Sequence, residues 1–185
     1  MIETISSTFS IIEETTVAER TEKGLTIFEE LMSYKERVFL ICLGFSRNVV
    51  DAEDLTQEVY LKAFKNINTI KDVELSKFWL FRITRNTCLD FRKKHRPDQL
   101  SSLESGMKQF EPRSPESQMI FHEKLRSLKS AIQRLPKKQN EVFILREYGD
   151  LSYQEIAEVM KIKEGTVMSR LTRARRALLN QMKGE

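Results

Sequence analysis

LSYQEIAEVMKIKEGTVMSRLTRARR, residues 151–176, is the stretch that decides the fold. It predicts two helices joined by a very short turn, and the second helix ends in a cluster of arginines. Such a pair lets one helix lie in the major groove of DNA while its basic end holds phosphates. The stretch therefore indicates a helix-turn-helix unit.

The second of these helices has a clear apolar stripe. Val167, Leu171, Ala174 and Leu178 recur at i, i+4, i+7 and i+11, so they should face a core. The opposite side carries short polar groups and long basic ones, which suit base edges and phosphates. These residues are Met168, Ser169, Thr172, Arg173 and Arg176.

The first helix has the matching apolar face, formed by Ile156, Ala157 and Met160. Ser152 is a suitable N-cap, and Glu155 three residues later completes a capping box. The alternative is a solvated basic helix on an ordinary bundle. The capped short helix and the tight turn favour the DNA-binding interpretation.

Composition narrows the class of protein. The chain has 185 residues, a net charge of +4 and a pI near 9.0, which suits a nucleic-acid binder. Cys42 and Cys88 lie in apolar helical patterns, so we expect buried free thiols rather than a disulfide or ligand pair. His95 and His122 lack ligand partners nearby, so we expect no metal site. Neither a membrane span nor a signal peptide is predicted, which favours a cytoplasmic protein.

The pattern along the chain predicts an all-α protein with two small helical domains joined by a flexible linker. Residues 1–23 should form a loose tail, and residues 24–96 a first helical domain. Residues 97–115 contain three of the four prolines, with several serines and Gly106 between them, and they are interpreted as the linker. Residues 116–185 should form the second domain.

The periodic segments predict where the helices lie. One helix should run from Leu25 through Cys42, and another should open at Asp51 and Asp54. Ser76 could cap a third helix that runs to Arg96. In the second domain, Pro136 suits the first position of a helix that ends near Tyr148.

The helix that begins at Asp51 has a mixed acidic and apolar face. Asp54, Gln57, Glu58 and Leu61 share it at three- and four-residue spacing. This face could dock a basic partner helix. Alternatively, the acids could simply complement the dipole of the helix N-terminus, which explains the first two aspartates better than Gln57 and Glu58.

The helix after Ser76 carries a basic stripe. Arg82, Arg85, Arg92 and Arg96 lie at i, i+3, i+10 and i+14, with Asn86 and Asp90 on an adjoining face. Arginines track phosphates, whereas Asn and Asp can read bases. Aromatic residues interleave this charge, and they suit either stacking on unpaired bases or filling a core, with the core favoured for Trp79. They are Phe78, Trp79, Phe81 and Phe91.

At these residues the chain resembles the extracytoplasmic-function (ECF) sigma factors of bacterial RNA polymerase, in the sigma-70 family. DAEDLTQEVYLKAF (51–64) is similar to region 2.2 of that family, and FWLFRITRNTCLDFR (78–92) is similar to regions 2.3 and 2.4. Residues 135–176 resemble region 4. Two departures are Lys161, where family members often have glycine in the turn, and the long tail before Gly24.

The resemblance implies an alternative sigma factor that directs promoter recognition and transcription initiation. It implies contacts with core polymerase, at the clamp helices of the β′ subunit, by Asp54, Leu55, Gln57, Glu58 and Leu61. It implies minus-10 DNA contacts by Arg82, Arg85, Asn86, Asp90 and Arg92, together with the loop 69–76. It implies minus-35 DNA contacts by Thr166, Met168, Ser169, Arg170, Thr172, Arg173 and Arg176.

The expected partners are therefore core RNA polymerase, promoter DNA and an anti-sigma factor. No cofactor, small-molecule substrate or catalytic residue is expected. A stand-alone helix-turn-helix regulator is the main alternative, but it leaves the acidic face and the basic-aromatic helix unexplained. A nucleic-acid enzyme would need clustered carboxylates or His/Cys ligands near the basic groove, and the sequence offers no such cluster.

Overall fold

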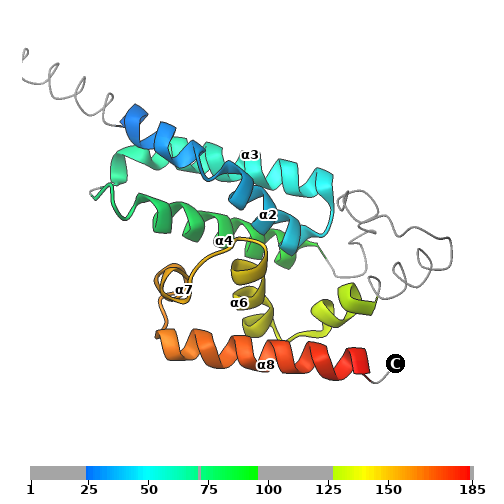
Figure 1. The fold of residues 1–185 in the computed structure, drawn as a ribbon. Coiled ribbons are helices and arrows are strands. Elements are labelled where there is room, and N and C mark those ends of the chain that lie inside the picture. Colours follow the sequence, from blue (N-terminus) through cyan, green and yellow to red (C-terminus); the bar gives the residue numbers. More distant parts are fainter. Residues whose placement is uncertain (1–23, 71, 96–126, 184–185) are drawn as a thin grey trace, which may run out of the picture.

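The computed structural model describes residues 24–70, 72–95 and 127–183 (Figure 1). Over these ranges the chain consists of helices and the turns between them, without a strand, as the sequence predicted. The expected N-terminal tail and the linker at 97–115 lie outside the described residues. Within the described part, no helix is both long and apolar enough to cross a membrane.

The first expected helix is in fact two helices. Residues 24–32 are helical, and α2 (Lys35–Ser46) follows after a turn at Ser33 and Tyr34. The Ser33 hydroxyl donates to the Glu30 carbonyl at 2.7 Å, and the Tyr34 N–H donates to the Leu31 carbonyl at 3.1 Å. A side chain that bonds to the backbone in this way competes with the helical ladder. The apolar period continues across the turn, which is why the sequence did not reveal it.

The next helix, α3 (Val49–Asn66), begins before the two aspartates that were expected to open it. Asn48 is its N-cap, and the Asn48 side chain accepts hydrogen bonds from the N–H groups of Val50 and Asp51. A short 3-10 helix, η1 (Ile67–Thr69), follows α3.

The expected cap of the third helix is wrong. In α4 (Ser76–Lys94) the N-cap is Leu75, and Ser76 is already the first helical residue. The Ser76 hydroxyl is buried without a hydrogen-bond partner among the described residues.

Three helices, α2, α3 and α4, enclose the core of the N-terminal domain (24–95). Phe45, Phe81 and Leu80 are fully buried there. Cys42 and Cys88 are buried free thiols with their sulfur atoms 3.7 Å apart, which confirms the prediction for both.

The C-terminal domain (127–183) contains a helix at 127–134, then α6 (Lys137–Glu147), α7 (Tyr153–Met160) and α8 (Glu164–Lys183). Pro136 is the N-cap of α6 and not its first helical residue, so the helix begins one residue later than expected. The predicted capping box of α7 is present: the Glu155 N–H donates to the Ser152 hydroxyl at 3.1 Å, and the Ser152 N–H donates to the Glu155 carboxylate at 2.8 Å. Lys161 ends α7 in a left-handed conformation, with φ of 52°.

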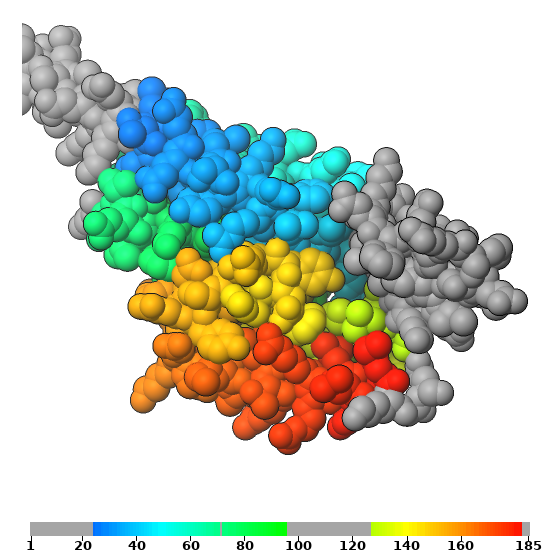
Figure 2. All heavy atoms as spheres, viewed as in Figure 1, coloured from blue at the N-terminus to red at the C-terminus, as the bar shows by residue number. Residues whose placement is uncertain are grey.

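The apolar stripe of α8 faces the core as predicted, because Val167, Leu171, Ala174 and Leu178 are all buried. The main hydrophobic cluster runs from Ile27 to Leu171, so it includes residues of both domains. In Figure 1, α6 stands between α8 and the layer formed by α2 and α4, and Figure 2 shows the C-terminal helices lying directly against the N-terminal ones. The two predicted domains therefore pack against each other.

Candidate nucleic-acid interface

The outward side of α8 presents the residues that the sequence assigned to duplex DNA, all of them polar or basic except Met168. We call this set the recognition face: Thr166, Met168, Ser169, Arg170, Thr172, Arg173 and Arg176. Thr166 and Arg170 are half-buried and the others are exposed. Arg175 points elsewhere and pairs with Glu147 of α6 at 2.8 Å. Arg170, Arg173 and Arg176 form no ion pair within the described ranges, so their guanidinium groups are available to a ligand.

Two hydroxyl groups of the recognition face already donate to the helix itself. The Ser169 hydroxyl donates to the Thr166 carbonyl at 3.0 Å, and the Thr172 hydroxyl donates to the Met168 carbonyl at 2.9 Å. A hydroxyl has two acceptor lone pairs besides its one proton. In this arrangement Ser169 and Thr172 can therefore accept hydrogen bonds from base amino groups.

A hollow of about 460 Å³ adjoins the recognition face. The N-terminal end of α6 forms one wall, and four residues of the recognition face form the other: Thr166, Ser169, Arg170 and Arg173. The α6 wall consists of Pro136, Lys137, Lys138 and Gln139. Lys137, Lys138 and Gln139 could not be assigned to this surface from the sequence, because only the tertiary structure brings the start of α6 beside α8.

The acidic face of α3 is exposed, and we call it the docking face: Asp54, Gln57, Glu58 and Leu61. Leu61 is 60% exposed, and Phe64, at 55%, extends the apolar part of the face by one turn. Glu58 forms an ion pair with Lys62 at 2.6 Å. Leu55 is a correction: it is only 3% exposed and packs in the core beneath this face, so it cannot itself touch a partner.

The basic stripe of α4 is not free in this structure. Arg85 pairs with Glu141, and its Nε lies 2.9 Å from the Glu141 carboxylate. Arg92 donates to the Asn140 side chain at 2.8 Å, and Arg82 donates to the Glu158 carbonyl at 3.2 Å. All three acceptors belong to the C-terminal domain. The remaining member of the predicted stripe, Arg96, lies outside the described residues.

Burial lowers the pKa of two arginines at the contact between the domains. Burial lowers the pKa of Arg92, although the Glu141 carboxylate partly opposes the shift. Burial and the neighbouring Arg92 lower the pKa of Arg47 to about 10. A guanidinium is nonetheless always charged in proteins. The contact between the domains therefore contains charged arginine side chains that are partly removed from water.

The two residues expected to read bases beside the stripe are accessible. Asn86 is exposed, and its side-chain oxygen accepts a hydrogen bond from Arg85 at 3.3 Å. Asp90 is exposed and pairs with Lys93 at 2.8 Å, and this hydrogen bond and charge lower the pKa of the Asp90 carboxyl.

The aromatic residues of α4 divide into two groups. Phe81 is fully buried in the core, where its ring lies 5.1 Å from the Arg37 guanidinium, so it cannot stack on a base. Phe78, Trp79 and Phe91 are half-buried against the core. Trp79 thus mainly fills the core, the reading that the sequence favoured. Among the described residues there is no group of His, Cys, Asp and Glu that could hold a metal ion.

Two known sequence families match the chain in the order of its domains. Sigma-70 region 2 matches residues 31–97, and Sigma-70, region 4 matches residues 125–178. The first match contains the docking face and the basic stripe, and the second contains the whole recognition face.

Curated relatives are similar over most of their length. The ECF RNA polymerase sigma factor SigW of Bacillus subtilis (strain 168) is 30% identical over 159 residues, which covers 81% of this chain and 85% of the relative. The RNA polymerase sigma-H factor of Pseudomonas aeruginosa is 31% identical over 175 residues, covering 88% and 90%.

Two solved structures have a similar fold. The sigma factor RpoE from Bartonella quintana, in complex with the anti-sigma factor NepR, aligns with a TM-score of 0.62 at 26% identity, over 84% of this chain and 95% of that one. CnrH, in complex with the cytosolic domain of CnrY, aligns with a TM-score of 0.66 at 19% identity, over 91% and 95%.

Proposed function

Because the chain belongs to the extracytoplasmic-function sigma factors of bacterial RNA polymerase, we propose that its three polar surfaces divide the work of promoter recognition. A sigma factor binds core polymerase and directs it to the minus-10 and minus-35 elements of a promoter, and regions 2 and 4 are both present here. In this proposal the docking face binds the clamp helices of the β′ subunit. The basic stripe, Asn86 and Asp90 bind the minus-10 strand, and the recognition face reads the minus-35 duplex.

The observation that carries the proposal is the recognition face. Arg175 of α8 is paired within the protein, whereas Arg170, Arg173 and Arg176 are left for a ligand. The adjoining hollow adds Lys137 and Lys138, which are exposed at the start of α6. Cations on both walls suit the phosphates that flank a helix in the major groove. We therefore add Lys137 and Lys138 to the minus-35 surface as phosphate contacts.

Opening of the minus-10 strand is assigned to Asn86 and its neighbours. Exposing an unstacked base costs a few kcal/mol, which a basic groove and a base-sized site can offset. Polymerase supplies the chemistry of RNA synthesis, so this chain carries no covalent step. It acts in the cytoplasm with polymerase and DNA, and an anti-sigma factor controls it, as NepR binds the similar sigma factor RpoE of Bartonella quintana.

A transcription assay with purified core polymerase tests this function. The template carries promoters located by mapping transcription start sites after overexpression of the chain. The chain should direct run-off transcripts from them, whereas a stand-alone helix-turn-helix regulator would bind the DNA without programming core polymerase. Failure of the chain to bind core polymerase or to start transcripts would overturn the proposal.

The role of Asn86 is tested in the same assay. Asn86→Ala should lower the permanganate reactivity of thymines in the open bubble but leave binding to a duplex minus-35 fragment unchanged. Asn180→Ala is the matched control, because Asn180 is an exposed asparagine near the end of α8 and belongs to none of the three proposed surfaces. Unchanged thymine reactivity in Asn86→Ala would remove Asn86 from the mechanism.

A further inference from the structure

Two buried thiols face each other between α2 and α4 in the core of the N-terminal domain. Cys42 of α2 and Cys88 of α4 are both fully buried, and the Cys88 thiol donates a hydrogen bond to the Cys42 sulfur over 3.7 Å. They lie 46 positions apart in the sequence, with the whole of α3 between them. Neither sulfur belongs to a surface assigned to polymerase or DNA, so the proposed function gives the pair no role.

Two thiols in contact can be oxidised to a disulfide, in which the sulfur atoms lie about 2.05 Å apart. Disulfides in cytoplasmic proteins are usually transient and catalytic or redox-sensing. A structural zinc site, by contrast, takes four ligands, and no group of three or more His, Cys, Asp and Glu in the described part of the chain could hold a metal ion. The chemistry that this pair suits is therefore oxidation.

The surroundings of Cys88 determine how fast an oxidant can act. The thiolate, and not the thiol, attacks an oxidant. The hydrogen bond to Cys42 and burial raise the pKa of the Cys88 thiol well above its usual range, although the nearby Arg92 cation opposes the shift. The thiolate is therefore scarce in the folded domain, and an oxidant reaches the sulfurs only when the core opens locally. The pair should respond to lasting oxidation and not to a brief exposure.

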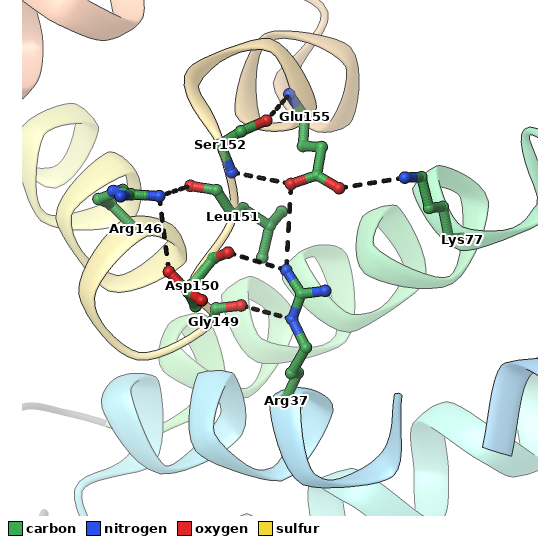
Figure 3. Close-up of polar contacts among 8 residues, drawn as sticks. All are labelled: Arg37, Lys77, Arg146, Gly149, Asp150, Leu151, Ser152 and Glu155. Atoms are coloured by element: carbon green, nitrogen blue, oxygen red, sulfur yellow. Dashed lines mark hydrogen bonds and ion pairs between the residues drawn. The ribbon is translucent and has the colours of Figure 1, made fainter. Parts of the chain in front are cut away.

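The two helices that carry the thiols are held near their first turns by polar contacts (Figure 3). Arg37 of α2 donates through Nε to the Gly149 carbonyl at 2.8 Å and through Nη2 to the Asp150 carbonyl at 2.9 Å. The Glu155 carboxylate lies 4.0 Å from Arg37 Nη2 and 3.2 Å from Lys77 Nζ of α4, so it bridges the two helices. These contacts fix the beginnings of α2 and α4 relative to each other.

Cys42 and Cys88 lie further along the same helices, and their sulfurs must come roughly 1.6 Å closer to form a disulfide. Rotation of the two side chains supplies part of this approach. Because the beginnings of the helices are held, the rest must come from the helix ends that carry the sulfurs. Asn86 and Asp90 stand two residues on either side of Cys88, on the exposed side of α4. A binding site tolerates displacements of only about 0.5 Å, so closing the disulfide would disturb both residues.

We propose that Cys42 and Cys88 form an oxidation site, at which a peroxide closes a disulfide between α2 and α4 and so weakens the opening of the minus-10 strand. The formation of the bond concerns the chain alone. Its effect on strand opening rests on the function proposed above for Asn86 and Asp90.

The reaction consumes one molecule of hydrogen peroxide for each pair of thiols. One sulfur, as the thiolate, attacks a peroxide oxygen, breaks the O–O bond and becomes a sulfenic acid, and hydroxide leaves. The other sulfur attacks the sulfenic sulfur, forms the S–S bond and displaces a second hydroxide. The two hydroxides take up the two thiol protons. The thiols thus lose two electrons and two protons, and the peroxide is reduced to two molecules of water.

The first test looks for the bond in the full, folded chain. The protein is incubated with hydrogen peroxide, the remaining free thiols are blocked, and mass spectrometry of a non-reduced protease digest detects linked peptides. Prolonged incubation should give a monomer in which the peptides of Cys42 and Cys88 are joined. Recovery of both thiols in the free form would overturn the proposal and leave them as residues that only fill the core.

The second test asks whether the bond acts on the promoter. Excess peroxide is removed before core polymerase and template are added. The oxidised chain should give roughly threefold less permanganate reactivity of thymines in the open bubble than the reduced chain, because a small misplacement of a binding residue is costly. Binding to a duplex minus-35 fragment should not change, since α8 is outside the cross-link. A chain that carries the disulfide but opens promoters normally would overturn the effect on strand opening.

Dithiothreitol distinguishes the disulfide from other oxidation. Peroxide also converts exposed methionines to the sulfoxide, and Met168 of the recognition face is 50% exposed. A thiol reductant reverses a disulfide, whereas methionine sulfoxide is restored by dedicated reductases. Opening should therefore recover after dithiothreitol treatment. Loss of opening that dithiothreitol does not reverse would assign the effect to methionine and overturn the role of the disulfide.

Cys42→Ala and Cys88→Ala are the matched controls, because each removes one sulfur and leaves the other in place. Both should open promoters as the reduced chain does, and neither should show a loss that dithiothreitol reverses. Because a cavity destabilises a core, circular dichroism checks each fold. Cys42→Ser or Cys88→Ser, which nearly keeps the volume, replaces an alanine variant that unfolds. A reversible loss in either single variant would show that the pair is not the site.

These outcomes are separate from those of the proposed function. If the disulfide formed but the reduced chain failed to direct transcription with core polymerase, the function would fall and the oxidation site would stand. If transcription succeeded but no disulfide formed, only the oxidation site would fall.

Discussion

Arg173 lies at the centre of the recognition face, where it lines the hollow together with Ser169 and Arg170. Its long side chain could reach a guanine edge or a phosphate, and the two roles have different consequences. A bidentate base contact is worth about 1–3 kcal/mol at one base position, whereas a phosphate contact affects all sequences alike. Its exposed position on α8 and its freedom from any ion pair in the described part of the chain favour the base role. Arg176, nearly one turn further along, is assigned to phosphate.

The prediction for Arg173→Ala is a loss of preference at one base of the minus-35 element, with little change in salt dependence. Arg176→Ala should instead weaken binding to all sequences and reduce the salt slope by about one unit. Binding to a library of minus-35 duplexes at two salt concentrations separates the two effects. A uniform loss for Arg173→Ala with a shallower slope would reverse its assignment.

Lys161 is a residue in a strained conformation. It ends α7 with φ of 52°, and the following residue, Ile162, donates its N–H to the Ala157 carbonyl at 3.0 Å. Glycine is the usual residue at such a helix end, because a side chain in the left-handed region costs roughly 1–2 kcal/mol.

We predict that Lys161→Gly stabilises the protein by about 0.5–1 kcal/mol, since part of the relief is offset by the greater entropy of glycine in the unfolded chain. Urea denaturation gives the free energy of unfolding. Lys163→Gly is the control: Lys163 is also exposed but has no positive φ, so this substitution should be neutral or destabilising. Equal effects of both substitutions would show that Lys161 is not strained.

Local chemistry explains which residues could be predicted from the sequence. Ser152 and Glu155 exchange hydrogen bonds within one helical turn, so their spacing in the sequence was enough to predict the capping box. Ser76 has the same capping chemistry, but it lies one residue inside its helix and is buried, which depends on tertiary packing. Leu55 belongs to the resembling segment, yet whether it faces a partner or the core depends on the rotation of α3.

At the scale of elements, α3 uses opposite sides for core packing and for the docking face. Its buried side packs against α2 and α4, whereas the docking face is turned to solvent. Because exposed substitutions usually change stability little, this face can be altered without unfolding the domain.

Charge reversal on the docking face, Asp54→Lys with Glu58→Lys, should weaken binding to core polymerase at least tenfold, about 1.4 kcal/mol. Fluorescence anisotropy with purified core enzyme measures the affinity, and circular dichroism checks the fold. Glu29→Lys with Glu36→Lys is the control, because it changes the net charge equally at exposed positions on the two preceding helices. Equal losses in both doubly substituted chains would mean that net charge, not the docking face, determines binding.

The break between residues 24–32 and α2 shows why element boundaries were harder to predict than element types. Leu31 and Val38 on either side are both buried, so the apolar pattern continues through the turn. The turn depends on backbone hydrogen bonds at Ser33 and Tyr34, which leave no mark on the periodicity. The helical class and the order of the long helices were nevertheless predictable, because the apolar stripe of each of these helices extends over several turns.

At the scale of the whole molecule, the main hydrophobic cluster contains residues of both domains and so joins them. Elements that share a core usually unfold in one cooperative transition. We therefore predict a single calorimetric transition for the unaltered chain, with equal calorimetric and van't Hoff enthalpies. Gly44→Ala should broaden it or divide it into two, because the added carbon would lie 2.8 Å from Cγ2 of Ile144 in the other domain. Gly165→Ala should leave it single, because nothing lies within 4 Å of the added carbon there. Two separate transitions in the unaltered chain would contradict the shared core.

The contact between the two domains could not be predicted from the sequence. Arginines at i, i+3 and i+10 predict a partner rich in oxygen acceptors, but their donors do not distinguish a phosphate from the Glu141 carboxylate or the Glu158 carbonyl of the same chain. Nor did the pattern of α2 single out Gly44 or Arg37, whose roles arise from segments more than a hundred positions away.

Residues 96–126 join the two domains as one covalent chain, and this changes what can break the contact between them. Tethered domains meet at an effective concentration on the order of millimolar, which does not depend on how many copies of the protein a cell contains. Dilution would separate two independent proteins but would not weaken the contact between these two domains. A ligand that requires the domains to be apart must therefore compete with an intramolecular contact at every protein concentration.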